Sequence, residues 1–240
     1  MAVQMARTEA EPDAALVDIW SWSLDLPDDE IARLATLLST DEAIRAARFV
    51  KERDALRYVA GRGRLRLILG DYLGIAPRRL TFAYNDFGKP YLTSASRTDL
   101  HFNLSHSADR AVLAISDRFP LGIDIEQAKP MEEDVAGHFF SPKECAVLRA
   151  MPQHLYIPGF YRCWTRKEAF VKAHGAGLSL ALDAFDVPLG NDTALKLERL
   201  DDTIGTPDDW SLLDLDVPEG FFGAVAALTS GTPVGLRYRS

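Results

Sequence analysis

The stretch that decides the fold is the hexapeptide LGIDIE, at residues 121–126. Alternation of apolar and charged residues, as at 123–126, is typical of a β-strand, because successive side chains of a strand point to opposite faces. A strand here places Asp124 and Glu126 on one face and Ile123 and Ile125 on the other. We therefore predict a strand with two carboxylates side by side.

The two carboxylates repel each other unless a positive charge lies between them. Mg²⁺ is a hard cation that proteins hold with one or two carboxylates together with substrate phosphates. Taken alone, Asp124 and Glu126 are more simply interpreted as the solvated face of an edge strand. The metal hypothesis needs a second element.

The segment WTRKEAFVK, residues 164–172, is predicted to be a helix that supplies this element. Trp164, Glu168 and Lys172 are four residues apart in succession, so they lie along one helix face. An ordinary surface ion pair between Glu168 and Lys172 would give the same pattern. The alternative is that Glu168 joins the two acids of the strand around a metal, and that Lys172 reaches a phosphate held there.

The order of the elements predicts two α+β halves of similar size. We assign residues 1–15 to a loose tail, 16–118 to an N-terminal half and 119–240 to a C-terminal half. Helices are expected from Pro27, from Thr40 and at 53–73 in the first half, and at 142–150 and 159–174 in the second. Strands are expected at 17–22, 81–84, 100–104, 111–116 and 121–126, and near 184–187, 194–200, 210–216, 221–228 and 234–238.

The composition excludes several classes of protein. The chain has 240 residues, of which 47% are hydrophobic and 26% charged, an ordinary globular composition. A net charge of −8 argues against a general nucleic-acid binder. Cys145 and Cys163 form no CxxC pair and indicate reduced thiols. Because the sequence has neither an 18-residue apolar run nor a secretory signal, we expect a cytoplasmic protein that binds no membrane.

Together these motifs resemble the signature of the 4′-phosphopantetheinyl transferases, Gly-Ile-Asp-x-Glu followed by Trp-x-x-Lys-Glu-Ala-x-x-Lys. Trp164 follows Asp124 by 40 residues, and every fixed position of the signature is filled. The resemblance extends over about residues 45–190. It includes FNLSHS at 102–107, FGKP at 87–90 and a segment from Arg48 to Gly61 that is similar to the Sfp-type (surfactin-synthetase-activating) subgroup.

The resemblance implies an α+β fold, a pseudo-twofold pseudodimer of two similar α/β halves with the active site in the cleft between them. Since one chain already holds both halves, we expect a monomer. The implied reaction transfers the 4′-phosphopantetheine arm of coenzyme A to a serine of an apo acyl or peptidyl carrier protein and releases adenosine 3′,5′-bisphosphate. It depends on Mg²⁺, with Mn²⁺ as a substitute. The implied metal ligands are Asp124, Glu126 and Glu168.

The same resemblance implies contacts to the diphosphate of coenzyme A. Lys172, with help from Lys167, would contact the diphosphate, and Ser105 and His106 would hold phosphate oxygens. Outside its motif, His106 is more simply a structural histidine. The base that takes the serine proton is either Glu168 or a metal-bound water. The implied catalytic residues are Glu168, Lys172 and Asp124.

At the other end of coenzyme A, Arg45, Arg57 and Lys89 are the candidates for the 3′-phosphate and adenine. The chain departs from the family at one position here. Some members have a lysine early in the helix before Arg45, where this chain has Glu42. The chain therefore differs from those members at the nucleotide end of the implied site.

Two other functions fit the same motifs. One is a Mg²⁺-dependent phosphohydrolase that uses the same carboxylates on a nucleotide diphosphate, and the other is a non-catalytic coenzyme A-binding module. The segment His138-Phe139-Phe140 is a candidate carrier-protein surface, although adjacent phenylalanines are more often core. Glu144 follows Ser141 by three residues and is more simply a capping-box residue than a base.

Overall fold

A strand and three helices open the fold in the computed structural model, which describes residues 14–93, 100–130, 135–190, 195–201 and 204–240. Strand β1 (Ala15–Ser23) leads into α1 (Asp28–Ala35), α2 (Thr40–Ala46) and the long helix α3 (Glu52–Leu73). Helix α3 ends at Gly74, whose φ of 63° is left-handed and suits glycine. These elements confirm the predicted strand and helices of the first half.

The first sheet has four strands in the order β4-β5-β1-β9. Strand β1 pairs antiparallel with β5 and parallel with β9, and Asp18 of β1 accepts a hydrogen bond from Arg237 Nε of β9 at 2.5 Å. A short 3₁₀ turn, η1 (Pro77–Arg79), and the separate hairpin β2–β3 lie between α3 and β4. The strands are β2 (Phe82–Tyr84), β3 (Pro90–Leu92), β4 (His101–Ser107), β5 (Arg110–Ser116) and β9 (Val234–Arg239).

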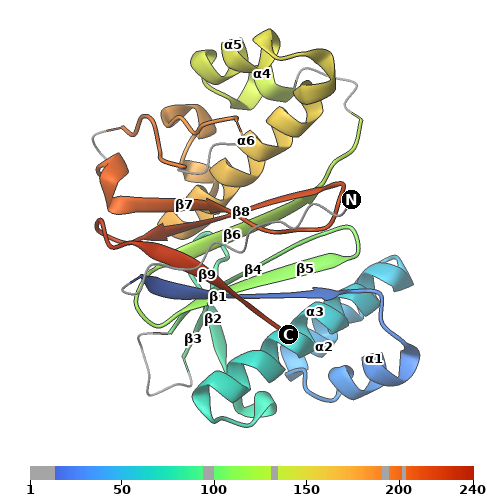
Figure 1. The fold of residues 1–240 in the computed structure, drawn as a ribbon. Coiled ribbons are helices and arrows are strands. Elements are labelled where there is room, and N and C mark those ends of the chain that lie inside the picture. The colour runs from blue at the N-terminus through green and yellow to red at the C-terminus, as the bar shows by residue number, and fades with distance from the viewer. Residues whose placement is uncertain (1–13, 94–99, 131–134, 191–194, 202–203) are drawn as a thin grey trace, which may run out of the picture.

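The second sheet has three antiparallel strands in the order β6-β8-β7. Helix α6 lies across this sheet, and α4 and α5 lie near its first turns (Figure 1). The elements are β6 (Leu121–Gln127), α4 (Val135–Phe139), α5 (Pro142–Ala150), α6 (Gln153–His174), η2 (Gly177–Ser179), η3 (Leu182–Ala184), η4 (Pro207–Asp209), β7 (Trp210–Asp214) and β8 (Phe221–Leu228).

The two sheets pack against each other, and the long helices cover their outer faces. One apolar cluster joins the sheets, and it includes Val17, Ile19, Val112, Ala114, Ile123, Ile125, Val225 and Ala227. Helix α3 covers the first sheet through Leu65 and Leu69, and α6 covers the second through Ala169 and Phe170. Figure 1 shows this succession of helix, sheet, sheet and helix. The buried Ile123 and Ile125 confirm the predicted apolar face of β6.

Some predicted elements differ in the structure. Helix α6 begins at Gln153, six residues before the predicted start, and includes Pro158, whose missing N–H removes only one bond near the helix start. The strands predicted near 184–187 and 194–200 are wrong for the described residues, which form only an isolated bridge between Asp186 and Arg199. The backbone there binds side chains instead. Residue 194 lies outside the described residues.

The predicted boundaries of the chain can be compared with the sheets. Ala15, which the prediction assigned to the tail, is the first residue of β1, and residues 1–13 lie outside the described residues. Strand β9 comes from the predicted C-terminal half but lies in the sheet of the N-terminal half.

Both 22-residue helices, α3 and α6, end at a left-handed glycine. The mixed α+β fold agrees with the prediction, whereas the pseudo-twofold relation of the halves stays a prediction. No helix within the described ranges is long and apolar enough to cross a bilayer.

Helix α6 approaches β6 closely at Gly122. A Cβ atom built on Gly122 would lie 2.3 Å from the carbonyl oxygen of Ala169 and 2.3 Å from the nitrogen of Ala173. Real Cβ contacts are essentially never this short, so only glycine allows the helix backbone to rest on the strand. This contact brings Lys172 of α6 next to Asp124 of β6.

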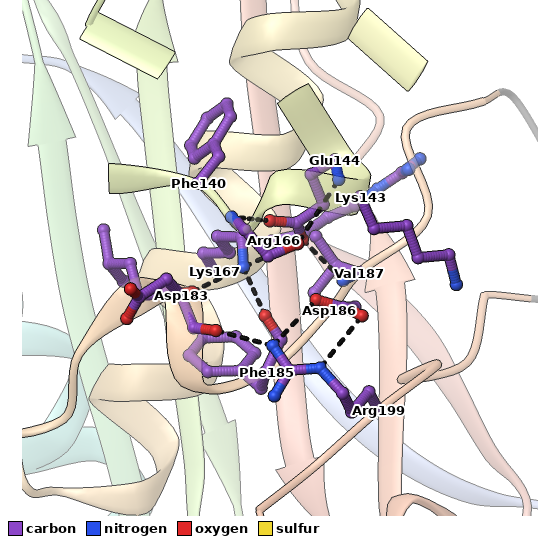
Figure 2. Close-up of polar contacts among 12 residues, drawn as sticks. Phe140, Lys143, Glu144, Arg166, Lys167, Asp183, Phe185, Asp186, Val187 and Arg199 are labelled. Atoms are coloured by element: carbon purple, nitrogen blue, oxygen red, sulfur yellow. Dashed lines mark hydrogen bonds and ion pairs between the residues drawn. The ribbon is translucent and has the colours of Figure 1, made fainter. Parts of the chain in front are cut away.

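The opposite side of α6 is anchored by a buried charge network (Figure 2). Lys167 is fully buried, and its Nζ lies 2.8 Å from Glu144 Oε1 and donates to the carbonyls of Leu182 and Phe185, each at 2.6 Å. Glu144 also accepts the N–H of Val187 at 2.8 Å and forms the predicted capping box of α5 with Ser141. These bonds use the backbone groups that a strand at 184–187 would have needed.

Replacing Gly122 by alanine is expected to lower the free energy of unfolding by about 2 to 3 kcal/mol, because the methyl group must push α6 away from β6. Chemical denaturation measures this loss. Gly61→Ala is the matched control, since its Cβ would lie 3.5 Å from Leu24 in ordinary contact and alanine favours a helix interior. An unfolding free energy for Gly122→Ala equal to that of wild type would contradict the close contact.

A double-mutant cycle tests the Glu144–Lys167 pair. Lys167→Met and Glu144→Gln are each expected to lower the free energy of unfolding by about 3 kcal/mol, because each removes one partner of a buried ion pair. The double variant should lose less than the sum, because it leaves no unpaired buried charge. Strictly additive losses in denaturant titrations would show that the two side chains do not interact.

Candidate active site

A cavity of ≈ 350 Å³ lies where β4, β6 and α6 meet. Strands β4 and β6 contribute residues from the first and second sheet, and α6 contributes one helix face. The residues that line the cavity are Leu104, Ser105, His106, Asp124, Glu126, Trp164, Glu168 and Lys172. The structure thus brings together both predicted motifs, the two strand acids and the helix face with Glu168 and Lys172.

Side chains of β4 join the two sheets at this cavity. Asn103 Oδ1 accepts the backbone N–H of Ile123 at 2.8 Å, and Ser105 Oγ donates to Asp124 Oδ1 at 2.9 Å. Two residues further, Ser107 Oγ donates to Glu126 Oε2 at 2.6 Å. Polar groups at every second position of β4 therefore hold the acidic strand in place.

Lys172 is the nearest positive charge to the buried acid. Its Nζ donates to Asp124 Oδ1 at 2.6 Å and to Ser105 Oγ at 3.0 Å. Asp124 is only 3% exposed, and its second oxygen, Oδ2, is buried without a hydrogen-bond partner. One oxygen of this carboxylate, Oδ1, is thus paired, and the other, Oδ2, is an acceptor without a donor.

Burial raises the pKa of all three acids at the cavity. For Asp124 burial is the largest cause, and the Lys172 charge opposes it. For Glu168 burial comes first and the charge of Asp124 second, whereas for Glu126 the bond from Ser107 partly offsets burial. Three carboxylates therefore share the ammonium of Lys172, so additional positive charge would be favourable.

The donor set fits a hard cation in chemistry. Carboxylate oxygens are the ligands of Mg²⁺, and Asp124 Oδ2 is a buried oxygen that lacks a partner. The described residues contain no group of three or more His, Cys, Asp or Glu side chains already gathered in a metal-holding arrangement. Asp124, Glu126 and Glu168 thus line one cavity without converging on a single point.

His106 and Trp164 complete the lining. Removal from water, and then the Lys172 charge, lowers the pKa of His106, which favours its neutral form. Trp164 lies on the same helix face as Glu168 and stacks on Phe160 at 5.9 Å. Leu104 and Trp164 were missed as cavity residues, although the spacing had placed Trp164 on the correct face.

Asn103 and Ser107 were also missed as residues that hold the acidic strand. A signal for them exists in the sequence, because Asn103, Ser105 and Ser107 recur at the period of two that puts them on one face of a strand. What the period does not reveal is that this face lies against β6. That placement depends on residues far away in the chain.

The structure does not bring Arg45 or Arg57 to the cavity lining. Arg57 donates to both oxygens of Asp25, at 2.6 and 2.7 Å, and to the carbonyl of Ala108 at 2.8 Å. Arg45 is exposed, with its guanidinium 5.5 Å from the ring centre of Tyr58. Arg57 therefore ties the end of β1 to the turn between β4 and β5, beside His106.

Lys89 and Lys167 are also absent from the cavity lining. Lys89 Nζ donates to two backbone carbonyls, those of Leu121 and Lys172. Lys167 is enclosed by the Glu144 network on another face of α6. Lys167 points away from the cavity because adjacent helix residues such as Lys167 and Glu168 point in directions about 100° apart. Lys89 is held instead by its two backbone bonds.

Glu42, the position where the chain departs from the family, is 1% exposed. It accepts from Arg62 Nε at 2.5 Å and from Arg66 Nε at 2.6 Å, and it caps α2 through the N–H of Ser39 at 2.9 Å. A buried acid between two arginines joins α2 to α3. Glu42 therefore has a structural role at this position.

The two phenylalanines of the suggested carrier-protein surface, Phe139 and Phe140, differ in exposure to solvent. Phe140 is 4% exposed and belongs to the apolar core, as is usual for adjacent phenylalanines. Phe139 is 45% exposed, and its ring lies edge-on to Trp164 with centroids 5.6 Å apart. An exposed aromatic residue thus lies next to the cavity lining.

Comparisons with known proteins show the family to which the chain belongs. Residues 120–224 match the family described as 4′-phosphopantetheinyl transferase superfamily, and residues 22–118 match 4′-phosphopantetheinyl transferase, N-terminal. The chain is 38% identical to 4′-phosphopantetheinyl transferase HetI of Nostoc sp., over 90% of this chain and 89% of HetI. It is 34% identical to 4′-phosphopantetheinyl transferase Sfp of Bacillus subtilis, over 73% of this chain and 77% of Sfp.

Among solved structures, the holo-[acyl-carrier-protein] synthase of Thermotoga maritima shows a partial likeness. It has a TM-score of 0.37 and 18% identity, over 47% of this chain and 64% of that chain. The two matched families together cover nearly all of the described chain. On the sequence similarity, the chain belongs to the 4′-phosphopantetheinyl transferase superfamily and is an enzyme of that kind.

Proposed function

We propose that this enzyme transfers the 4′-phosphopantetheine arm of coenzyme A to a serine of an apo acyl or peptidyl carrier protein, with adenosine 3′,5′-bisphosphate as the leaving group. The observation that carries the proposal is the cavity in which Lys172, three carboxylates and the Ser105-His106 pair meet. The polar groups of this cavity suit a diphosphate. The family of the chain favours transfer of the phosphopantetheine arm over hydrolysis.

The reaction forms a bond between the serine Oγ of the carrier and the β-phosphorus of coenzyme A, and it breaks the bond from that phosphorus to the bridging oxygen of the diphosphate. Positioning and charge dominate such transfers. Lys172 is 29% exposed, so its ammonium can turn from Asp124 toward a diphosphate oxygen. Ser105 and His106 line the same cavity and would orient the phosphate.

Glu168 is the proposed acceptor of the serine proton. It lines the cavity, and burial, followed by the charge of Asp124, raises its pKa. A free carboxylate with a raised pKa is a stronger base than one in water, so Glu168 would accept the proton when it is not bound to the metal ion. Asp124 acts differently, because its paired oxygen Oδ1 holds Lys172 and Ser105 in position.

Asp124, Glu126 and Glu168 are the proposed ligands of Mg²⁺, for which Mn²⁺ would substitute. When bound, the ion would offset the negative charge of the diphosphate and of the leaving oxygen. The unpartnered Oδ2 of Asp124 and the raised pKa of the three acids support this part of the proposal.

The proposal also concerns the setting of the enzyme. A monomer suffices, because β4, β6 and α6 of one chain build the cavity. The two buried free thiols, Cys145 and Cys163, suit the reducing cytoplasm, where we place the enzyme. A carrier protein would approach beside the exposed Phe139.

Incubation with coenzyme A, Mg²⁺ and a panel of apo carrier proteins should add the mass of phosphopantetheine to at least one carrier, as read by mass spectrometry. Glu168→Gln is expected to lower the transfer rate by about 10²-fold or more, because it removes the proton acceptor and a charge at the cavity. Glu219→Gln, at an exposed residue before β8, is the matched control and should transfer at the wild-type rate.

Two outcomes would contradict the proposal. One is that no carrier gains mass, and the other is that adenosine 3′,5′-bisphosphate forms from coenzyme A without any carrier. The second result would favour the phosphohydrolase. Binding of coenzyme A without any product would favour the non-catalytic module.

Removing divalent metal with a chelator should stop transfer, and adding Mg²⁺ or Mn²⁺ should restore it. A second measurement does not depend on activity. Mg²⁺ should raise the thermal midpoint of the wild-type enzyme, because a ligand that binds only the folded state stabilises it, and Asp124→Asn should reduce this shift. An equal shift in both proteins would place the ion elsewhere.

A further inference from the structure

The turn between β2 and β3, residues 85–89, touches the catalytic elements without lining the cavity. We infer that Lys89 in this turn is a positioning residue, which holds the last turn of α6 against the start of β6 so that Lys172 meets Asp124. This role differs from the one the sequence predicts, a contact to the nucleotide end of coenzyme A. The inference rests on the proposed function.

The Lys89 ammonium joins the two elements directly. Its Nζ donates to the carbonyl of Leu121 at 2.9 Å and to the carbonyl of Lys172 at 2.7 Å. Leu121 begins β6, three residues before Asp124. Lys172 carries the side chain that pairs with Asp124 at 2.6 Å. One amine thus connects the backbone of Lys172 to the start of the strand that carries Asp124.

The bond to Lys172 meets a need of the helix. The last four carbonyls of a helix have no partner within it, and α6 ends at His174 with Gly175 as its cap. A positive charge at the C-terminal end of a helix is also favourable. Burial lowers the pKa of Lys89 to about 8, so the amine remains largely protonated at neutral pH and donates to both carbonyls.

The turn itself is built to hold this amine. Asn85 Oδ1 accepts the backbone N–H of Phe87 at 3.0 Å and of Lys89 at 2.8 Å, and its Nδ2 donates to the carbonyl of Gly175 at 3.1 Å. Phe87 packs so closely on Gly177 that a Cβ there would lie 2.6 Å from its own Cβ. The turn therefore contacts the end of α6 at several points.

The two roles predict different kinetics. A ligand of the nucleotide contributes to binding of coenzyme A, so its loss raises KM and Kd. A positioning residue acts through Lys172 and Asp124, so its loss lowers kcat, and small misplacements of catalytic groups are costly. A substrate without the 3′-phosphate, 3′-dephospho-coenzyme A, separates the two further.

For Lys89→Met we expect kcat to fall by about tenfold or more, with KM and Kd for coenzyme A within about twofold of wild type. The preference for coenzyme A over 3′-dephospho-coenzyme A should stay unchanged. Lys196→Met, at a lysine whose side chain is 76% exposed and does not line the cavity, is the matched control. A raised KM with loss of that preference and an unchanged kcat would overturn the inference.

A second variant covers the case in which Lys89→Met does not fold, as judged by circular dichroism. Asn85→Ala keeps the amine but removes the bonds that orient the turn, and it should also lower kcat with little change in KM. A wild-type enzyme inactive on every carrier would instead refute the proposed function. Calorimetric Kd values for coenzyme A would then still decide whether Lys89 or Asn85 contributes to binding the nucleotide.

Discussion

The contact of helix α6 with strand β6 at Gly122 is the constraint on which the cavity depends. Because no Cβ separates the two backbones there, the strand and the helix are held at a fixed offset. That offset places Asp124, two residues along the strand, beside Lys172 on the helix. A larger residue at position 122 would move Lys172 away from Asp124 without changing either side chain.

The cavity gathers more negative charge than the fold alone would favour. Burial raises the pKa of Asp124, Glu126 and Glu168, which means that their charged forms oppose folding. Away from the cavity the fold treats buried charge differently, because Glu42 and Glu144 are fully paired with arginine or lysine. A cluster of buried charges without enough opposite charge, in a fold whose other buried acids are paired, is typical of functional sites.

The sequence predicts the parts of the site that rest on local periodicity. The period of two in β6 and the spacing of four in α6 put Asp124, Glu126, Glu168 and Lys172 on the correct faces, because these spacings follow from backbone geometry alone. The geometry thus agrees with the part of the prediction that local spacing can supply.

The rest of the site depends on residues that are distant in the chain. Lys89 bonds to carbonyls at 121 and 172, and Arg57 bonds to Asp25 and Ala108. No local pattern indicates such partners. The strand predicted near 184–187 failed for the same reason, since the backbone of Phe185 and Val187 is bound by Lys167 and Glu144.

The parallel pairing of β1 with β9 has a consequence for how the chain is made. Strand β1 has β5 on one side and needs residues 234–239 on the other, which a ribosome adds more than two hundred residues later. Until then Asp18 lacks Arg237, and one edge of the first sheet stays open to other strands. The first sheet is therefore complete only once residues 234–239 have been added, and until then the free edge of β1 is available for pairing with other strands.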